Sequence, residues 1–172
     1  MQKHPFRAML AAALALGVAP LLFAQSNYPT KPIRVIVPYA PGGGSDIVAR
    51  ITGQKMSEAL GQTMVVDNRP GAAGMLGAEL AENSPADGYT LLLADSSFTI
   101  NASYFKKKRY DAQTGFVPVS LIADTPYILA VHPAVPAATL NEFIQLAKSQ
   151  PGKINVGSAG TGSGSHLIGA MF

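Results

Sequence analysis

The apolar and polar positions of the chain follow two alternating patterns, short β-branched runs and longer stretches with helical spacing. Residues 33–37 form a β-branched run that predicts a buried strand, and residues 47–60 have the spacing of a helix. Residues 63–66 and 89–94 predict two further strands, with a second helix between them that ends at about Asn83. Strands and helices that alternate with short connections predict an α/β fold with a largely parallel sheet.

The second half of the chain predicts more strands and one well-defined helix. Residues 116–122 and 126–131 are apolar runs typical of strands, and we interpret the break at 123–125 as a crossover between two lobes. Thr139 and Glu142 fit a capping box at the start of a helix whose apolar side chains repeat at helical spacing. This pattern makes it the most secure of the predicted helices.

The first residues of the chain have the pattern of a secretory signal peptide. Lys3 and Arg7 precede an uncharged run, 8–24, that ends in small residues, and we expect cleavage after Ala24. An uncleaved membrane anchor is the alternative, less favoured because the run is near the lower limit for spanning a bilayer and contains a glycine and a proline. The expected order is a signal peptide in 1–24, a first α/β lobe in 25–125 and the start of a second α/β lobe in 126–172.

Composition narrows the classes of protein further. The whole sequence has 13 basic and 10 acidic residues. Cleavage of the signal peptide would remove two basic residues, Lys3 and Arg7, so the mature chain would have 11 basic and 10 acidic residues. This balance gives no reason to expect a nucleic-acid partner, and the basic run 106–109 is typical of a solvated loop, with a nucleic-acid or acidic-lipid patch as the alternative. The chain has no cysteine and its three histidines lack metal-binding spacing, so we expect neither cofactor nor metal.

The first of two glycine-rich turns lies where the strand at 33–37 ends and a helix begins. Glycines let the backbone approach a ligand closely, and the unpaired amides and dipole of the helix favour an anion there. Asp46 either braces the turn as a helix-start residue, the favoured interpretation, or accepts a hydrogen bond from the ammonium group of an amino-acid ligand. Because ligands bind beyond the carboxyl ends of parallel strands, the candidate contacts are Tyr39, which offers an aromatic wall or a hydroxyl donor, Gly42, Gly43, Gly44, Ser45, Asp46 and, after the third strand, Ser96.

A second glycine-rich turn, 157–166, follows a predicted strand at 153–156 and precedes a predicted helix at 167–172. We interpret the two turns as two halves of one binding site. The candidate contacts in the second turn are Ser158, Gly160, Thr161, Ser163 and Ser165. The sequence ends inside the predicted helix without a stop signal, so we expect an incomplete second lobe.

Neither turn matches a nucleotide-binding or catalytic motif. Gly160, Gly162 and Gly164 have the wrong spacing for a dinucleotide fingerprint, and no lysine follows them as in a phosphate loop. No G-x-S-x-G elbow surrounds the serines, which makes an α/β hydrolase a weak alternative. His166 beside the serines could suggest nucleophilic catalysis, but it has no identified orienting carboxylate. We therefore expect local packing for His166 and binding without catalysis for the protein.

These motifs together resemble the periplasmic solute-binding receptors of tripartite tricarboxylate transporters, often called Bug-type receptors. The resemblance rests on many short matches in a constant order, none of which is specific by itself. They are the segments 28–33, 37–47, 67–74, 87–92, 131–133 and 158–166.

The resemblance implies a two-lobed fold of the periplasmic-binding-protein type II class, with the first lobe mostly present and the second incomplete. It implies a periplasmic receptor, not an enzyme, whose two glycine turns hold a carboxylated solute through backbone amides and ordered water. Its partners would be a small organic acid and the membrane subunits of a tripartite tricarboxylate transporter. Thr161 and Gly164 stand where asparagine and threonine are commoner in the family, which leaves the acid open. A secreted serine-dependent hydrolase and a non-binding truncated fragment are the alternatives.

Overall fold

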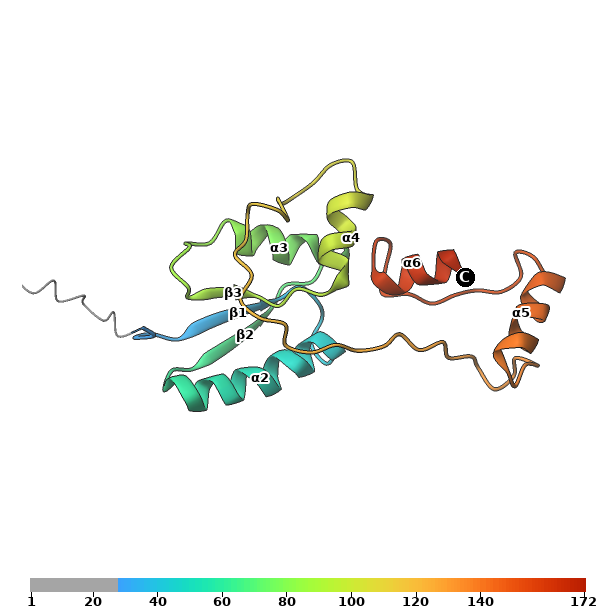
Figure 1. The fold of residues 1–172 in the computed structure, drawn as a ribbon, viewed down its shortest axis with the longest axis horizontal. Coiled ribbons are helices and arrows are strands. Elements are labelled where there is room, and N and C mark those ends of the chain that lie inside the picture. Colours follow the sequence, from blue (N-terminus) through green and yellow to red (C-terminus); the bar gives the residue numbers. More distant parts are fainter. Residues whose placement is uncertain (1–27) are drawn as a thin grey trace, which may run out of the picture. The chain divides into compact units, whose positions relative to one another are not determined.

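The computed structural model describes residues 28–172, so the predicted signal peptide and its cleavage point after Ala24 lie outside the described residues. The residues from Lys31 to Phe172 form one compact unit. Figure 1 shows that this unit contains a small sheet with helices on both sides and further helices towards its C-terminus.

The sheet has three parallel strands, β1 (Ile33–Val37), β2 (Met64–Asn68) and β3 (Thr90–Leu92), in the order β2-β1-β3. In the register of the sheet, Val35 of the central strand lies beside Val66 on one side and Leu91 on the other. The parallel sheet predicted from the sequence is therefore confirmed. The carboxyl ends of its strands meet at one edge, which is where the first glycine turn lies.

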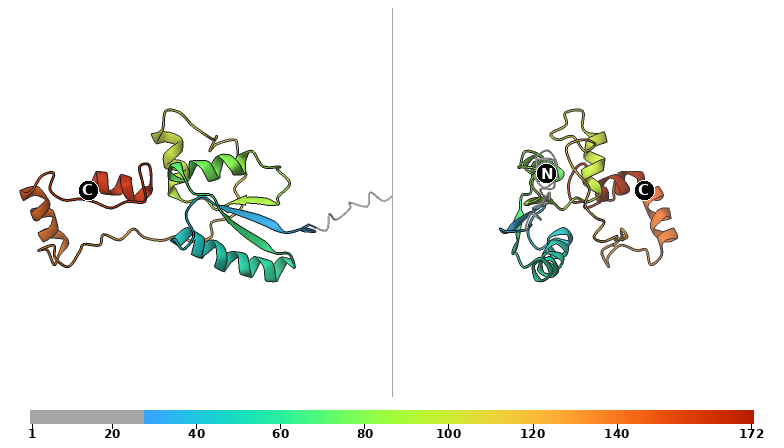
Figure 2. Two further views of the ribbon diagram at one scale, coloured as in Figure 1. Left: turned by 180° about the vertical axis from the view of Figure 1, so that it is seen from behind. Right: turned by 60° about the vertical axis from the view of Figure 1, so that its left-hand side comes forward.

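Two helices cover opposite faces of this sheet, α2 (Gly44–Leu60) on one side and α3 (Met75–Glu82) on the other, as Figures 1 and 2 show. A 3-10 turn, η1 (Ala72–Gly74), leads directly into α3. A further helix, α4 (Ser96–Tyr104), follows β3 and packs beside α3. The sequence did not predict α4.

The core of the unit lies mainly between the sheet and α2. Ile33 and Val37 are almost completely buried there, together with Ala49 from α2. Ile36 alternates to the opposite face and is buried as well. Burial of each such aliphatic side chain stabilises the fold by about 1.5–3 kcal/mol. This core holds β1 in place, and with it the turn that follows β1.

After β3, the described residues form helices but no further strand. The capping-box helix is confirmed as α5 (Leu140–Ser149), and the last predicted helix as α6 (Gly164–Met171), which begins three residues earlier than expected. The strands predicted at 116–122, 126–131 and 153–156 are wrong for this structure. These apolar runs have no neighbouring strand among the described residues with which their backbone could pair.

Candidate functional site

The first glycine turn leaves backbone donors exposed at the start of α2. Gly43 is the N-cap and has no side chain to accept from the helix amides, and Ile47 donates to its carbonyl at 3.0 Å. Within residues 28–172 the amides of Gly43, Gly44 and Ser45 have no hydrogen-bond acceptor. Unpaired amides at a helix N-terminus favour an anion. The turn therefore has the geometry expected of an anion-binding turn.

Asp46 is buried directly behind this turn, with only 3% of its surface exposed. Its Oδ2 accepts from the Gly42 amide at 2.9 Å and from Arg50 Nε at 3.0 Å, and its Oδ1 accepts from Asn68 Nδ2 at 3.0 Å. The hydrogen bonds from Arg50, then from Gly42 and Asn68, lower the pKa of the Asp46 carboxyl to about 2. The structure thus shows the bracing contacts that the sequence favoured for Asp46.

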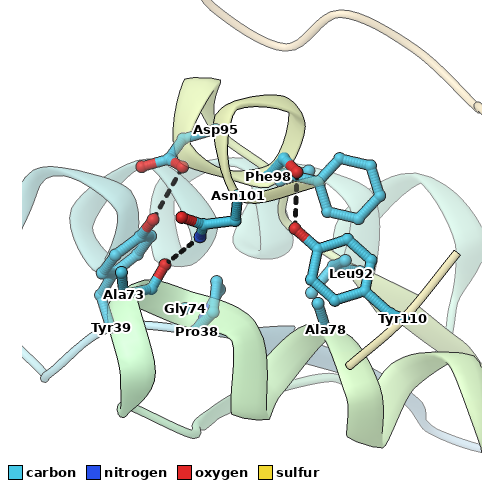
Figure 3. Close-up of a pocket in the computed structure, with 11 residues that line it drawn as sticks. Pro38, Tyr39, Ala73, Gly74, Ala78, Leu92, Asp95, Phe98, Asn101 and Tyr110 are labelled. Atoms are coloured by element: carbon cyan, nitrogen blue, oxygen red, sulfur yellow. Dashed lines mark hydrogen bonds between the residues drawn. The ribbon is translucent and has the colours of Figure 1, made fainter. Parts of the chain in front are cut away.

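Tyr39 is engaged within the protein instead of presenting a free hydroxyl. Its hydroxyl donates to Asp95 Oδ1 at 2.7 Å, as Figure 3 shows, and Asp95 also caps α4 by accepting from the Ser97 amide at 2.9 Å. Burial, more than any other cause, raises the pKa of Tyr39 above its ordinary value. Tyr39 therefore connects the turn after β1 with the turn after β3.

The cavity drawn in Figure 3 is too small for an organic acid. It lies among Tyr39, Gly74, Asp95, Asn101 and Tyr110, and its volume of ≈ 10 Å³ offers room for about one water molecule. Asn101 donates from Nδ2 to the Ala73 carbonyl at 2.7 Å, while its buried Oδ1 has no partner among the described residues. A solute held by the glycine turns would bind outside this cavity.

Ser96 lies where the start of α4 meets the start of α6. Its Oγ is 2.8 Å from the hydroxyl of Tyr127, and either atom can be the donor. A Cβ placed on Gly164 would touch the same tyrosine hydroxyl and would lie 2.8 Å from Ser96 Oγ. A larger residue at 164 would require these side chains to move, and the close approach brings Ser96 beside the second glycine turn.

The serine hydroxyls of the second turn mostly serve the turn itself. Ser163 is buried and caps α6 by accepting from the His166 amide at 3.2 Å. Ser165 Oγ accepts from the Ala159 amide at 3.1 Å, and Ser158 Oγ accepts from the Gly160 amide at 3.3 Å. Gly160 and Thr161 are exposed. Whether these residues contact a solute stays a prediction.

The ring of His166 is also used locally. Its Nδ1 accepts from the Gly162 amide at 3.4 Å, and its ring packs edge-on against Tyr104. In the part of the chain that the structure describes, no serine hydroxyl is hydrogen-bonded to this ring. A nucleophile and base pair is thus not assembled here. The same residues contain no group of three side chains suited to a metal ion.

Several residues that complete the site's framework were not singled out from the sequence. Asp95 could have been found, since an aspartate just before a helix is a common cap. The only sequence signal for Arg50 is its position four residues after Asp46, one helical turn further along. Asn68 and Tyr127 offer no local signal, because each finds its partner through the tertiary fold.

The chain is similar to a known protein family and to several known proteins. Residues 48–172 match the family model described as the tripartite tricarboxylate transporter family receptor. The protein BugT of Bordetella pertussis is 37% identical over 158 residues, which is 91% of this chain and 48% of BugT. The chain spans about half the length of the curated relatives it matches.

Solved structures agree with the fold. A protein described as a periplasmic transporter is 44% identical with a TM-score of 0.78, over 84% of this chain and 49% of that one. An adipate-bound protein of R. palustris is 32% identical with a TM-score of 0.76, over 79% and 46%. MatC of Rhodopseudomonas palustris with bound malate is 30% identical with a TM-score of 0.67, over 80% and 47%. Together with the family match, these similarities show that the chain belongs to the tripartite tricarboxylate transporter receptors, a family of periplasmic solute-binding proteins.

Proposed function

We propose that this protein captures a small organic acid outside the cytoplasm and delivers it to the membrane subunits of a tripartite tricarboxylate-type transporter. The observation that carries the proposal is the exposed turn at the start of α2, where three successive amides lack acceptors within residues 28–172. A carboxylate supplies the acceptors that these donors need.

Neutral backbone donors are sufficient to hold such a solute. A hydrogen bond to a charged group contributes about 1.5–3 kcal/mol, roughly twice a neutral one, and the dipole of α2 adds to the attraction. In the proposed site the first turn contributes Tyr39, Gly42, Gly43, Gly44, Ser45 and Asp46, the third strand end contributes Ser96, and the second turn contributes Ser158, Gly160, Thr161, Ser163 and Ser165. Asp46 and Tyr39 shape the site from behind, since their polar atoms are engaged with protein partners.

The similar proteins favour a dicarboxylate as the solute. One of them holds adipate and another malate, and both are small acids with two carboxylates. We propose that the first lobe, 25–125, grips one end of such an acid and that the second lobe, beginning at 126, grips the other. We further propose that a cleavable signal peptide, ending at Ala24, directs the protein to the periplasm.

We propose binding without turnover. His166 and the nearby serines could suggest a hydrolase, yet the ring of His166 is paired with the Gly162 amide and Ser165 Oγ with the Ala159 amide. A receptor also needs to release its solute unchanged, so small carboxylic acids and their esters should be recovered intact after incubation with the protein.

The variant Gly43→Val tests the proposed function. A Cβ at Gly43 would meet only the Ala40 carbonyl oxygen, at 3.6 Å, and the backbone φ of −77° suits any residue, so the unliganded fold should tolerate valine. The valine side chain would lie beside the open amides of the turn and obstruct the approach of a carboxylate. Calorimetry with succinate, malate and adipate should show saturable binding to the purified protein and at least about a tenfold loss in the variant.

The matched control is Ala59→Val, an exposed position near the other end of the same helix. It adds the same type of side chain to α2 without approaching the turn and should bind as the wild type does. Normal binding by Gly43→Val would exclude the first turn as the site.

A further inference from the structure

The Asp46 carboxylate is buried and surrounded by donors of the protein itself. Three donors are hydrogen-bonded to it, the Gly42 amide, Arg50 Nε and Asn68 Nδ2, and Arg50 Nη2 lies 3.0 Å from its Oδ1 as an ion pair. A carboxylate offers about four lone-pair sites, so three of them are taken and the Arg50 guanidinium lies beside the fourth. Its side chain is only 4% exposed, whereas the Arg50 side chain is 54% exposed. An ammonium group of a solute would have to displace a partner to bind here.

The same donors connect three parts of the first lobe. Asn68, at the end of β2, donates from Nδ2 to the Tyr39 carbonyl at 3.1 Å as well as to Asp46, and its Oδ1 accepts from Arg50 Nη2 at 3.2 Å. The end of β1, the start of α2 and the end of β2 are therefore tied by one closed set of hydrogen bonds. Within this set every side-chain oxygen has a protein donor.

These contacts fix the backbone of the turn at Gly42. Its φ of 84° is in the left-handed region that favours glycine, and its amide is held by Asp46. This contact reverses the chain just before the helix. Helices α4, α5 and α6 have side-chain caps, whereas Gly43 leaves the first amides of α2 open. Asp46 thus fixes the turn through the Gly42 amide and leaves the amides of Gly43, Gly44 and Ser45 open.

We propose that Asp46, together with Arg50 and Asn68, is a positioning residue that holds the amides of the first glycine turn ready for a carboxylate and does not itself touch the solute. This inference rests on the proposed function, because it concerns the same turn. It also distinguishes the two roles that the sequence left open for Asp46.

The decisive experiment compares acids with and without an ammonium group. Calorimetry with succinate and aspartate, glutarate and glutamate, and adipate and 2-aminoadipate would be run on the purified wild type, Asp46→Asn and Arg50→Gln. A positioning role predicts that Asp46→Asn weakens both members of each pair by the same factor, about tenfold or more. A direct contact with ammonium predicts a selective loss of the amino acids.

Arg50→Gln keeps the experiment decisive if Asp46→Asn folds poorly, because Arg50 is largely exposed. This variant frees part of the Asp46 carboxylate. A positioning role predicts weaker binding of every acid, whereas direct contact predicts that amino acids bind as well as before or better. Lys55→Gln on the same helix, whose partner is the exposed Glu58, is the matched control and should leave every affinity unchanged.

The possible results distinguish a failure of the proposed function from a failure of the positioning role of Asp46. If the wild type binds none of these acids, the proposed function is contradicted and the positioning role with it. If the wild type binds an acid and both variants bind it equally well, or if only amino acids are affected, the positioning role alone is overturned. A uniform loss in both variants supports it.

Discussion

Gly77 of α3 packs closely against Pro38, the residue that follows β1. A Cβ there would lie 2.7 Å from Pro38 Cβ, 2.9 Å from Pro38 Cα and 3.1 Å from the Arg69 carbonyl oxygen. Two of these atoms belong to the backbone and cannot rotate away. We expect Gly77→Ala to lower the free energy of unfolding by about 1–3 kcal/mol, measured by urea denaturation. Gly44→Ala is the control, since its Cβ would meet nothing within 4 Å and should be neutral or slightly stabilising.

Asp46 also predicts a dependence of stability on pH. Hydrogen bonds from Arg50, Gly42 and Asn68 hold the pKa of the folded carboxyl at about 2, below its ordinary 3.8. The unfolded chain therefore takes up the proton first as the pH falls, so the stabilisation is complete above a pH of about 4 and is lost as the pH falls through about 2. The difference in free energy of unfolding between wild type and Asp46→Asn should shrink between pH 5 and pH 2. A difference that stays constant over this range would contradict the assignment.

These residues also show how far the sequence could go at this scale. The position of Gly42, Gly43 and Gly44 between a strand and a helix follows from residue types alone. The partners of Asp46 do not, because Asn68 is 22 positions away and comes into reach only through the pairing of β1 with β2. Tyr39 was expected to face a ligand, yet Asp95, 56 positions away, takes its hydroxyl.

At the scale of elements, α5 combines a complete capping box with little buried surface. Phe143 is its one buried residue, while Thr139 Oγ1 accepts from the Glu142 amide and the Glu142 carboxylate accepts from the Thr139 amide, both at 3.3 Å. We expect Thr139→Ala to destabilise the helix by about 1 kcal/mol. Hydrogen exchange of the amides in α5 should accelerate while amides in β1 keep their protection. Thr139→Ser retains the acceptor and should restore the slow exchange.

Elements were predictable where their own residues determine them. The capping box and apolar spacing of α5 are local, and they were confirmed. Helix α4 has no clear apolar stripe; it is held by Asp95 at its start and by stacking of Phe98 on Tyr110 at 4.9 Å. The runs at 116–122 and 126–131 have strand composition, but a strand also needs a neighbour, which composition does not reveal.

At the scale of the whole unit, the segment from Val117 to Val131 leaves many apolar side chains exposed. Val117 is 88% exposed and Leu121 and Ile128 are each 85% exposed, and no β-ladder covers this backbone within residues 28–172. A long apolar surface favours association and binding of apolar dyes. We expect the 31–172 unit to bind the dye ANS, measured by fluorescence, and to self-associate at micromolar concentrations, measured by light scattering.

The double variant Leu121→Gln, Ile128→Gln should reduce both signals and leave the midpoint of urea unfolding unchanged, because neither side chain belongs to the core around β1. Lys107→Gln, an exposed change in a polar loop, should alter neither signal. If the double variant bound the dye as strongly as the wild type, the exposed surface would have to lie elsewhere, and a lower midpoint would mean that these side chains pack in solution.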